Sequence, residues 1–316
     1  MYDVASASFI LGMLFFVGYF FTVLPPIDAP YGVFIKVPSG TTVGEAARVL
    51  KQKHIINSSL VFEALVRQIG SKHCVIAGEY SFAYPENVVR IALRLATGNF
   101  QTKPLRVVLY EGTTAKQMAE ILGTQLHEFD EAEFLKIALP QEGYLFPDTY
   151  FFLPGAEPHD AYILLHNNFI QHISKPAIQT ELKRFDKPLS DIITMASIIE
   201  REAPPGKDRR IIAGILWHRI EIGMPLQVDA VFPYIMGKNS SNLTRADLAT
   251  TSPYNTYIYK GLPPGPIANP GEDAIVAALT PVQSKYIFFL SDKKGVFHYC
   301  ATYACQLANQ KKYLGN

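Results

Sequence analysis

Residues 4–24 form an uninterrupted apolar run, VASASFILGMLFFVGYFFTVL, that contains no charged side chain. About 20 apolar residues in a helix cross the ~30 Å hydrocarbon core of a bilayer, so this run predicts a transmembrane helix. A cleaved signal peptide is the alternative, but residues 1–3 include no basic side chain and the run leads into Pro25 and Pro26. We therefore expect residues 1–30 to be an anchor followed by a stiff, proline-rich tether.

The composition describes a folded chain without a strong electrostatic field. The chain has 316 residues, of which 48% are hydrophobic and 18% charged, which excludes a disordered or fibrous protein and is enough for about two domains. The formal net charge of +1 argues against nucleic acid as a partner. The three cysteines lack metal-site spacing, and Cys300 and Cys305 can either pair in an oxidising compartment or remain separate thiols.

An internal repeat lies in the first half of the chain. Residues 35–50, IKVPSGTTVGEAARVL, and residues 107–122, VVLYEGTTAKQMAEIL, share Gly, Thr, Thr, Ala and Leu in register. Each copy predicts a short strand, a glycine turn, a capping threonine and an amphipathic helix. Further elements are expected between the copies, namely helices at 60–69 and 87–97 and a strand at 77–82. This α+β region, residues 31–130, resembles the LysM-like module, a small glycan-binding fold.

The remainder, residues 131–316, is predicted to be a second, mixed α+β domain. Apolar periodicity and Pro or Gly stops predict helices at 159–172, 176–185, 190–203, 208–222 and 272–279. A hairpin is expected from strands 285–290 and 295–299, and a loop dense in Pro, Gly, Tyr and Asn covers 252–271.

The predicted helix at 190–203 is the best place in this chain for a catalytic acid. A helical wheel predicts a buried stripe of Ile192, Ala196, Ile199 and Ala203, with Thr194, Ser197 and Arg201 facing away. Glu200 and Glu202 then fall on opposite flanks of that stripe. A carboxyl group held against apolar side chains has a raised pKa, as a general acid requires. The wheel does not choose between the two glutamates, although the small neighbour Ala196 leaves room for a ligand beside Glu200.

A solitary carboxyl group suits one class of glycan chemistry. If a sugar's own hydroxyl attacks its anomeric carbon, one residue can protonate the leaving oxygen and then accept the proton of the attacking hydroxyl. Such a cleft also needs aromatic platforms and polar edges for sugars. The segments EGYLFPDTY at 142–150 and SPYNTY at 252–257 supply both.

Five motifs in one order resemble the YceG-like family of endolytic murein transglycosylases. They are EGYLFPDTY at 142–150, MASIIERE at 195–202, MPLQVD at 224–229, SPYNTY at 252–257 and GLPPGPIANPG at 261–271. The resemblance implies a single-pass inner-membrane enzyme with its catalytic region on the periplasmic side. It implies cleavage of the MurNAc-GlcNAc β-1,4 bond in nascent peptidoglycan strands, with 1,6-anhydroMurNAc ends that terminate elongation. Peptidoglycan synthases or division proteins are the implied protein partners.

The resemblance also implies roles for individual residues. In the family the acid/base is the first glutamate of the MASIIERE motif, which here is Glu200. The substrate-binding candidates come from the aromatic and polar motifs: Tyr144, Asp148, Tyr150, Gln227, Asp229, Tyr254, Asn255 and Thr256. No cofactor and no metal is expected.

Two other functions fit the same sequence. A hydrolytic muramidase would pair Glu200 with Asp148 or Asp229 as a second carboxylate and would leave reducing ends. A non-catalytic adaptor would bind glycan through the LysM-like region and use residues 131–316 as a scaffold.

Overall fold

The computed structural model describes residues 13, 18–19, 21–69, 75–82, 84–101, 104–126, 128–153, 155–238 and 242–315. Most of the predicted transmembrane helix at 4–24 lies outside these residues. Among the described residues, the structure contains no helix whose length and hydropathy would let it span a bilayer. The fold is α+β, as predicted.

The chain forms two compact units. The first comprises residues 1–106, 125–129 and 151–156, and the second comprises 107–124, 130–150 and 157–316. The second copy of the repeat therefore belongs to the second unit, whereas we predicted it within the 31–130 region. Its backbone explains the difference, because the Gly112 amide donates to the Asn269 carbonyl and the Asn269 amide donates to the Thr113 carbonyl.

Between residues 33 and 97, the described part of the first unit packs the helices α2, α3 and α4 with a two-stranded sheet. In chain order the elements are β1 (Val33–Val37), α2 (Val43–Gln52), α3 (Ser59–Ile69), β2 (Gly78–Phe82) and α4 (Val88–Thr97). The strands β1 and β2 are antiparallel, with Val33 opposite Phe82 and Val37 opposite Gly78. Their inward side chains join the apolar faces of the helices in one core that includes Leu50, Phe62, Tyr80 and Ile91.

The repeat has the local structure that its sequence predicts. The Thr42 hydroxyl accepts the Glu45 amide N–H, and the Glu45 carboxylate accepts the Thr42 amide N–H, which closes a capping box at the start of α2. The second copy repeats this arrangement with Thr114 and Gln117. Both copies turn at a glycine with positive φ, at Gly40 and Gly112.

The remaining elements follow the predicted order and add several short ones. They are β3 (Leu105–Val108), α5 (Ala115–Gln125), α6 (Glu131–Ala138), η1 (Leu139–Gln141), β4 (Thr149–Phe152), α7 (Pro158–Ile173), α8 (Pro176–Phe185), α9 (Leu189–Glu202), α10 (Lys207–Glu221), η2 (Asp229–Val231), α11 (Phe232–Met236), α12 (Arg245–Leu248), α13 (Glu272–Leu279), β5 (Phe288–Ser291), β6 (Phe297–Cys300), α14 (Tyr303–Asn309) and η4 (Gln310–Leu314). β3 pairs with β4, and β5 forms an antiparallel hairpin with β6.

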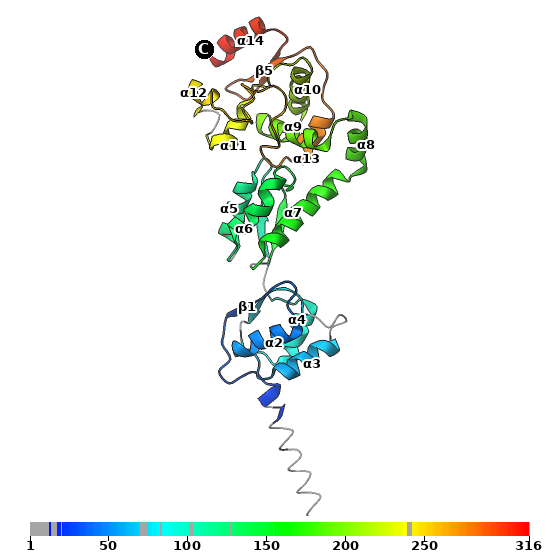
Figure 1. The fold of residues 1–316 in the computed structure, drawn as a ribbon, viewed down its shortest axis with the longest axis vertical. Coiled ribbons are helices and arrows are strands. Elements are labelled where there is room, and N and C mark those ends of the chain that lie inside the picture. Colours follow the sequence, from blue (N-terminus) through cyan, green and yellow to red (C-terminus); the bar gives the residue numbers. More distant parts are fainter. Residues whose placement is uncertain are drawn as a thin grey trace, which may run out of the picture. The chain divides into compact units, whose positions relative to one another are not determined.

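Helix α9 is the centre of the second unit. It packs against α10 and α13 (Figure 1), and every residue from Ile192 to Ile199 is buried. The expectation that Thr194 and Ser197 face away from the core is therefore wrong. Both hydroxyls are satisfied inside: Thr194 donates to the Ser190 carbonyl, while Ser197 donates to the Thr194 carbonyl and accepts the Ile267 amide. A small hydroxyl residue that bonds its own helix can be buried at little cost.

Candidate active site

The two glutamates at the end of α9 have different surroundings, and Glu200 is held in a buried ion pair. The Arg209 guanidinium donates to Glu200 Oε1 at 2.5 Å, and the Gly271 amide donates to Oε2 at 3.0 Å. The side chains of Arg209 and Glu200 are 2% and 5% exposed. Burial raises the pKa of Glu200, the Gly271 amide and Arg209 oppose that rise, and the negative charge of Glu111 adds to it. Glu200 is thus the counterion of a buried arginine.

Glu202 lines a cleft of about 410 Å³ in the second unit. One side of the cleft is polar, with Arg219 of α10 and the residues Gln227, Asp229 and Tyr257 around η2. The other side comes from the C-terminal hairpin and α14 and includes Phe288, Phe289, Phe297, Tyr303 and Gln306. A cleft that combines polar groups with aromatic side chains suits a carbohydrate ligand.

Glu202 has the protonation chemistry of a general acid. Burial raises its pKa to about 7, and the negative charge of Asp229 raises it further, while the Ala230 amide and Arg219 act in the opposite direction. The Ala230 amide donates to Glu202 Oε1 at 3.2 Å. A carboxyl group with this pKa is substantially protonated at neutral pH and can also carry a negative charge, so it can give and take a proton.

The polar side of the cleft is built by two motifs that bond each other. The Gln227 amide donates to the Thr256 carbonyl at 3.1 Å, and the Val228 amide donates to Thr256 Oγ1 at 3.1 Å. The Tyr257 hydroxyl donates to Asp229 Oδ1 at 2.5 Å. Gln227 itself has a φ of +51°, a left-handed conformation that costs backbone strain in a residue other than glycine.

The predicted binding residues divide into two groups. Gln227 and Asp229 line the cleft with Glu202. Asn255 and Thr256 are buried and hold the SPYNTY loop, where Asn255 donates to the Leu248 and Thr250 carbonyls. Tyr254 packs against Tyr234 at a ring distance of 5.0 Å and does not line this cleft.

The three candidates from EGYLFPDTY are also outside the cleft lining. The Tyr150 hydroxyl donates to the Phe146 carbonyl at 2.6 Å, and Asn168 donates to both Asp148 and Tyr150. The Tyr144 ring packs edge-on against Phe169. Through these contacts the three side chains stabilise the packing of the second unit.

Comparison with known proteins assigns the family. The profile of the YceG-like family matches residues 35–312, which is most of the chain. The chain belongs to the YceG-like family. An endolytic murein transglycosylase of Bacillus subtilis is 30% identical over 327 aligned positions, covering 93% of this chain and 89% of that protein. One of Streptococcus pneumoniae is 26% identical and covers 85% of this chain, which spans 56% of that longer relative.

A solved YceG-like structure has the same fold. The crystal structure of a YceG-like protein of Listeria monocytogenes superposes with a TM-score of 0.59 at 28% identity, covering 87% of this chain and 98% of that one. The five motifs in the sequence thus belong to a chain whose family and fold agree. Among the described residues, no group of three or more His, Cys, Asp or Glu side chains is arranged to hold a metal ion.

Motif reading missed several residues of this YceG-like cleft. Tyr257 ends the SPYNTY motif, but its bond to Asp229 depends on a contact across the fold. Arg219 belongs to none of the five motifs. The aromatic residues of the cleft belong to the C-terminal hairpin, for which the sequence predicts secondary structure but no role in binding. Glu202 was visible as one of two flanking glutamates, but its role could not be assigned without the cleft.

Proposed function

We propose that this chain is an endolytic lytic transglycosylase that cleaves the MurNAc-GlcNAc β-1,4 bond of nascent peptidoglycan, and that Glu202 is its acid/base. The observation that carries the proposal is a carboxyl group with a pKa of about 7 lining a polar and aromatic cleft. Membership of the YceG-like family and the names of the Bacillus and Streptococcus relatives support the reaction and the substrate.

The reaction needs one carboxyl group and no water. Protonated Glu202 donates its proton to the glycosidic oxygen, and the bond from that oxygen to C1 of MurNAc breaks. Positive charge develops at C1, where the negative Asp229 in the same cleft stabilises it. The C6 hydroxyl oxygen of the same sugar then bonds to C1, and its proton passes to the Glu202 carboxylate. The product is a 1,6-anhydro end, and Glu202 is protonated again.

The surroundings favour Glu202 over Glu200, to which the sequence resemblance assigned the chemistry. Glu200 already accepts hydrogen bonds at both oxygens, from Arg209 and from Gly271. Protonating it would leave a buried arginine without part of its counter-charge, which is costly. Glu202 accepts a hydrogen bond from the Ala230 backbone amide and lines the cleft. Glu200 is therefore proposed to position the end of α9 and the Gly271 loop.

The wider assignment of the chain follows from the same function. We propose that residues 4–24 anchor the protein in the inner membrane, with the catalytic region on the periplasmic side. The LysM-like region at 31–130 would hold the glycan strand, and cleavage would terminate strand elongation. Peptidoglycan synthases or division proteins are the proposed partners.

The test is a digest of un-crosslinked peptidoglycan strands with mass spectrometry of the product ends. The wild-type protein is expected to give 1,6-anhydro ends, and the Glu202→Gln variant none, with its thermal unfolding unchanged at pH 6. Glu200→Gln is the matched comparison. This variant should unfold at a lower temperature, because Arg209 loses its counterion, but it should still cleave strands below that temperature. If Glu200→Gln is folded and inactive while Glu202→Gln cleaves, the acid/base is Glu200.

A hydrolytic muramidase is the second candidate, because Asp229 lies in the same cleft as Glu202 and provides a second carboxylate. The same digest separates the two reactions, since hydrolysis leaves reducing ends. If the wild-type protein and both glutamate variants bind glycan strands and none of them cleaves, the result would favour the adaptor function.

A further inference from the structure

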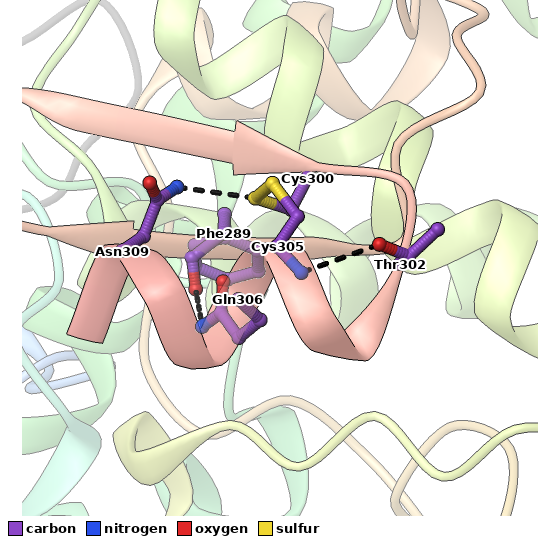
Figure 2. Close-up of a disulfide and its surroundings, with 6 residues drawn as sticks. All are labelled: Phe289, Cys300, Thr302, Cys305, Gln306 and Asn309. Carbon is purple, nitrogen blue, oxygen red and sulfur yellow. Dashed lines mark hydrogen bonds between the residues drawn. A yellow bond between two sulfur atoms is a disulfide. The ribbon is translucent and has the colours of Figure 1, made fainter. Parts of the chain in front are cut away.

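Helix α14 brings a glutamine to the cleft from the end of the chain. Gln306 is 8% exposed and lines the cleft together with Tyr303 from the same helix. Figure 2 shows Gln306 beside the backbone of Phe289, with the Cys300–Cys305 disulfide at the adjoining end of the helix. No motif in the sequence pointed to this residue.

The hydrogen bonding of Gln306 is half complete. Its Nε2 donates to the Phe289 carbonyl at 3.1 Å, which fixes the orientation of the amide. Its Oε1 is buried and has no hydrogen-bond partner among the described residues. A buried acceptor without a donor is unfavourable, and because Gln306 lines the cleft, a ligand group bound there can supply the missing donor.

The neighbours of Gln306 define what kind of ligand group would complete the bond. Phe288, Phe297 and Tyr303 line the same wall, so an acceptor lies among aromatic surfaces. An acetamido group matches this surface because it carries an N–H donor and an apolar methyl on one small unit. A plain sugar hydroxyl offers a donor but carries no methyl group to contact the aromatic surface.

We propose that Gln306 is a specificity residue that accepts a hydrogen bond from the acetamido N–H of a bound N-acetylated sugar. The inference rests on the proposed function, since it assumes that the Glu202 cleft takes glycan. It adds a prediction about substrate specificity: the cleft binds N-acetylated strands more tightly than otherwise similar β-1,4 glucans.

The disulfide gives Gln306 a fixed position. Cys300 ends β6 and Cys305 lies in the first turn of α14, so their bond joins the helix to the hairpin directly before Gln306. The Thr302 hydroxyl caps the helix by accepting the Cys305 amide, and Asn309 donates to Cys300 Sγ (Figure 2). A short helix is marginal by itself, so removing the disulfide should loosen the wall that presents Gln306.

The experiment compares two oligosaccharides by titration calorimetry on the full chain carrying Glu202→Gln, which prevents turnover. The ligands are the β-1,4 tetramer of N-acetylglucosamine and the β-1,4 tetramer of glucose, which differ at the acetamido groups. We expect the parent to prefer the acetylated tetramer. Adding Gln306→Met, which keeps the shape and removes the acceptor, should reduce that preference about 3- to 10-fold.

Two controls accompany the titration. Gln283→Met changes an exposed glutamine outside the cleft and should keep the parental preference. The double variant Cys300→Ser/Cys305→Ser should lower the preference in the same direction as Gln306→Met, with Gln306 still present. Thermal unfolding of each variant checks that the second unit remains folded.

The outcomes separate the inference from the proposed function. A folded Gln306→Met variant that keeps the full preference for the acetylated tetramer overturns the inference. Wild-type cleavage of peptidoglycan together with equal binding of both tetramers also overturns it and leaves the proposed function standing. A wild-type protein that neither cleaves strands nor binds either tetramer overturns both.

Discussion

Glu200 and Glu202 are separated by one residue, yet α9 turns them toward opposite surroundings. One is the counterion of Arg209, and the other faces a cleft with Asp229 and Arg219. A helical wheel predicts that two such residues lie on different flanks. It does not predict which flank meets a cleft, because the cleft wall comes from the C-terminal hairpin and α14. The candidate pair was thus available from the sequence, and the choice between its members required the fold.

The pH dependence of cleavage should report the pKa of Glu202. The acid must be protonated at the start of the reaction, and its pKa is raised to about 7, so kcat/KM should fall as pH rises above about 7. The charge of Asp229 helps to raise that pKa. Asp229→Asn should therefore move the falling limb to lower pH. Asp273→Asn is the control: Asp273 pairs with Arg209, the partner of Glu200, so this change should leave the midpoint unchanged. A midpoint that moves only with Asp273→Asn would assign the titration to Glu200.

Asn269 is a second residue whose importance is visible only in the fold. It is fully buried, its Oδ1 accepts the Gly143 and Leu145 amides, and its Nδ2 donates to the Thr113 carbonyl and to Glu142. Asn269→Leu should reduce the free energy of unfolding by about 3 kcal/mol or more, because several buried polar groups lose their partner. Urea denaturation measures this. Asn167→Leu, on the exposed side of α7, should stay within about 0.5 kcal/mol of wild type.

The longer elements were predictable from local pattern. Helices with clear caps and stops, such as α4 between Asn87 and Gly98, occur where the sequence predicts them. The short elements β4, α11 and α12 have four or five residues, too few for a periodic signal, and tertiary contacts define them. The burial of all sides of α9 was also unpredictable, because Thr194 and Ser197 satisfy their hydroxyls within the core.

Two helical glycines should respond oppositely to the same substitution. In α10, a Cβ on Gly214 would lie 2.0 Å from the Val282 carbonyl oxygen, so Gly214→Ala must push backbone apart and should destabilise by about 1–3 kcal/mol. In α2, a Cβ on Gly44 would meet only Glu63 Oε1 at 3.7 Å. Gly44→Ala should therefore stabilise by about 0.5–1 kcal/mol through helix propensity. Thermal denaturation of both variants tests this, and equal signs would contradict the described packing around α10.

At the scale of the whole molecule, the described residues of each compact unit include an apolar core. One includes Phe62 and Tyr80 in the first unit, and the other includes Phe232 and the buried residues of α9 in the second. The sequence predicted two regions but placed the boundary near residue 130. The compact units divide the chain differently, because the copy of the repeat at 107–124 belongs to the second unit.

Separate cores predict that the chain unfolds in more than one step. Each core is stabilised by its own buried side chains, so differential scanning calorimetry of the full chain should show two transitions. Phe62 and Phe232 are both fully buried, and each Phe→Ala change should cost about 3–5 kcal/mol locally. Phe62→Ala should lower one transition temperature, and Phe232→Ala the other. On heating, cleavage should be lost at the transition that Phe232→Ala lowers, because the Glu202 cleft lies in the second unit. A single transition lowered equally by both variants would mean that the two cores unfold as one cooperative structure.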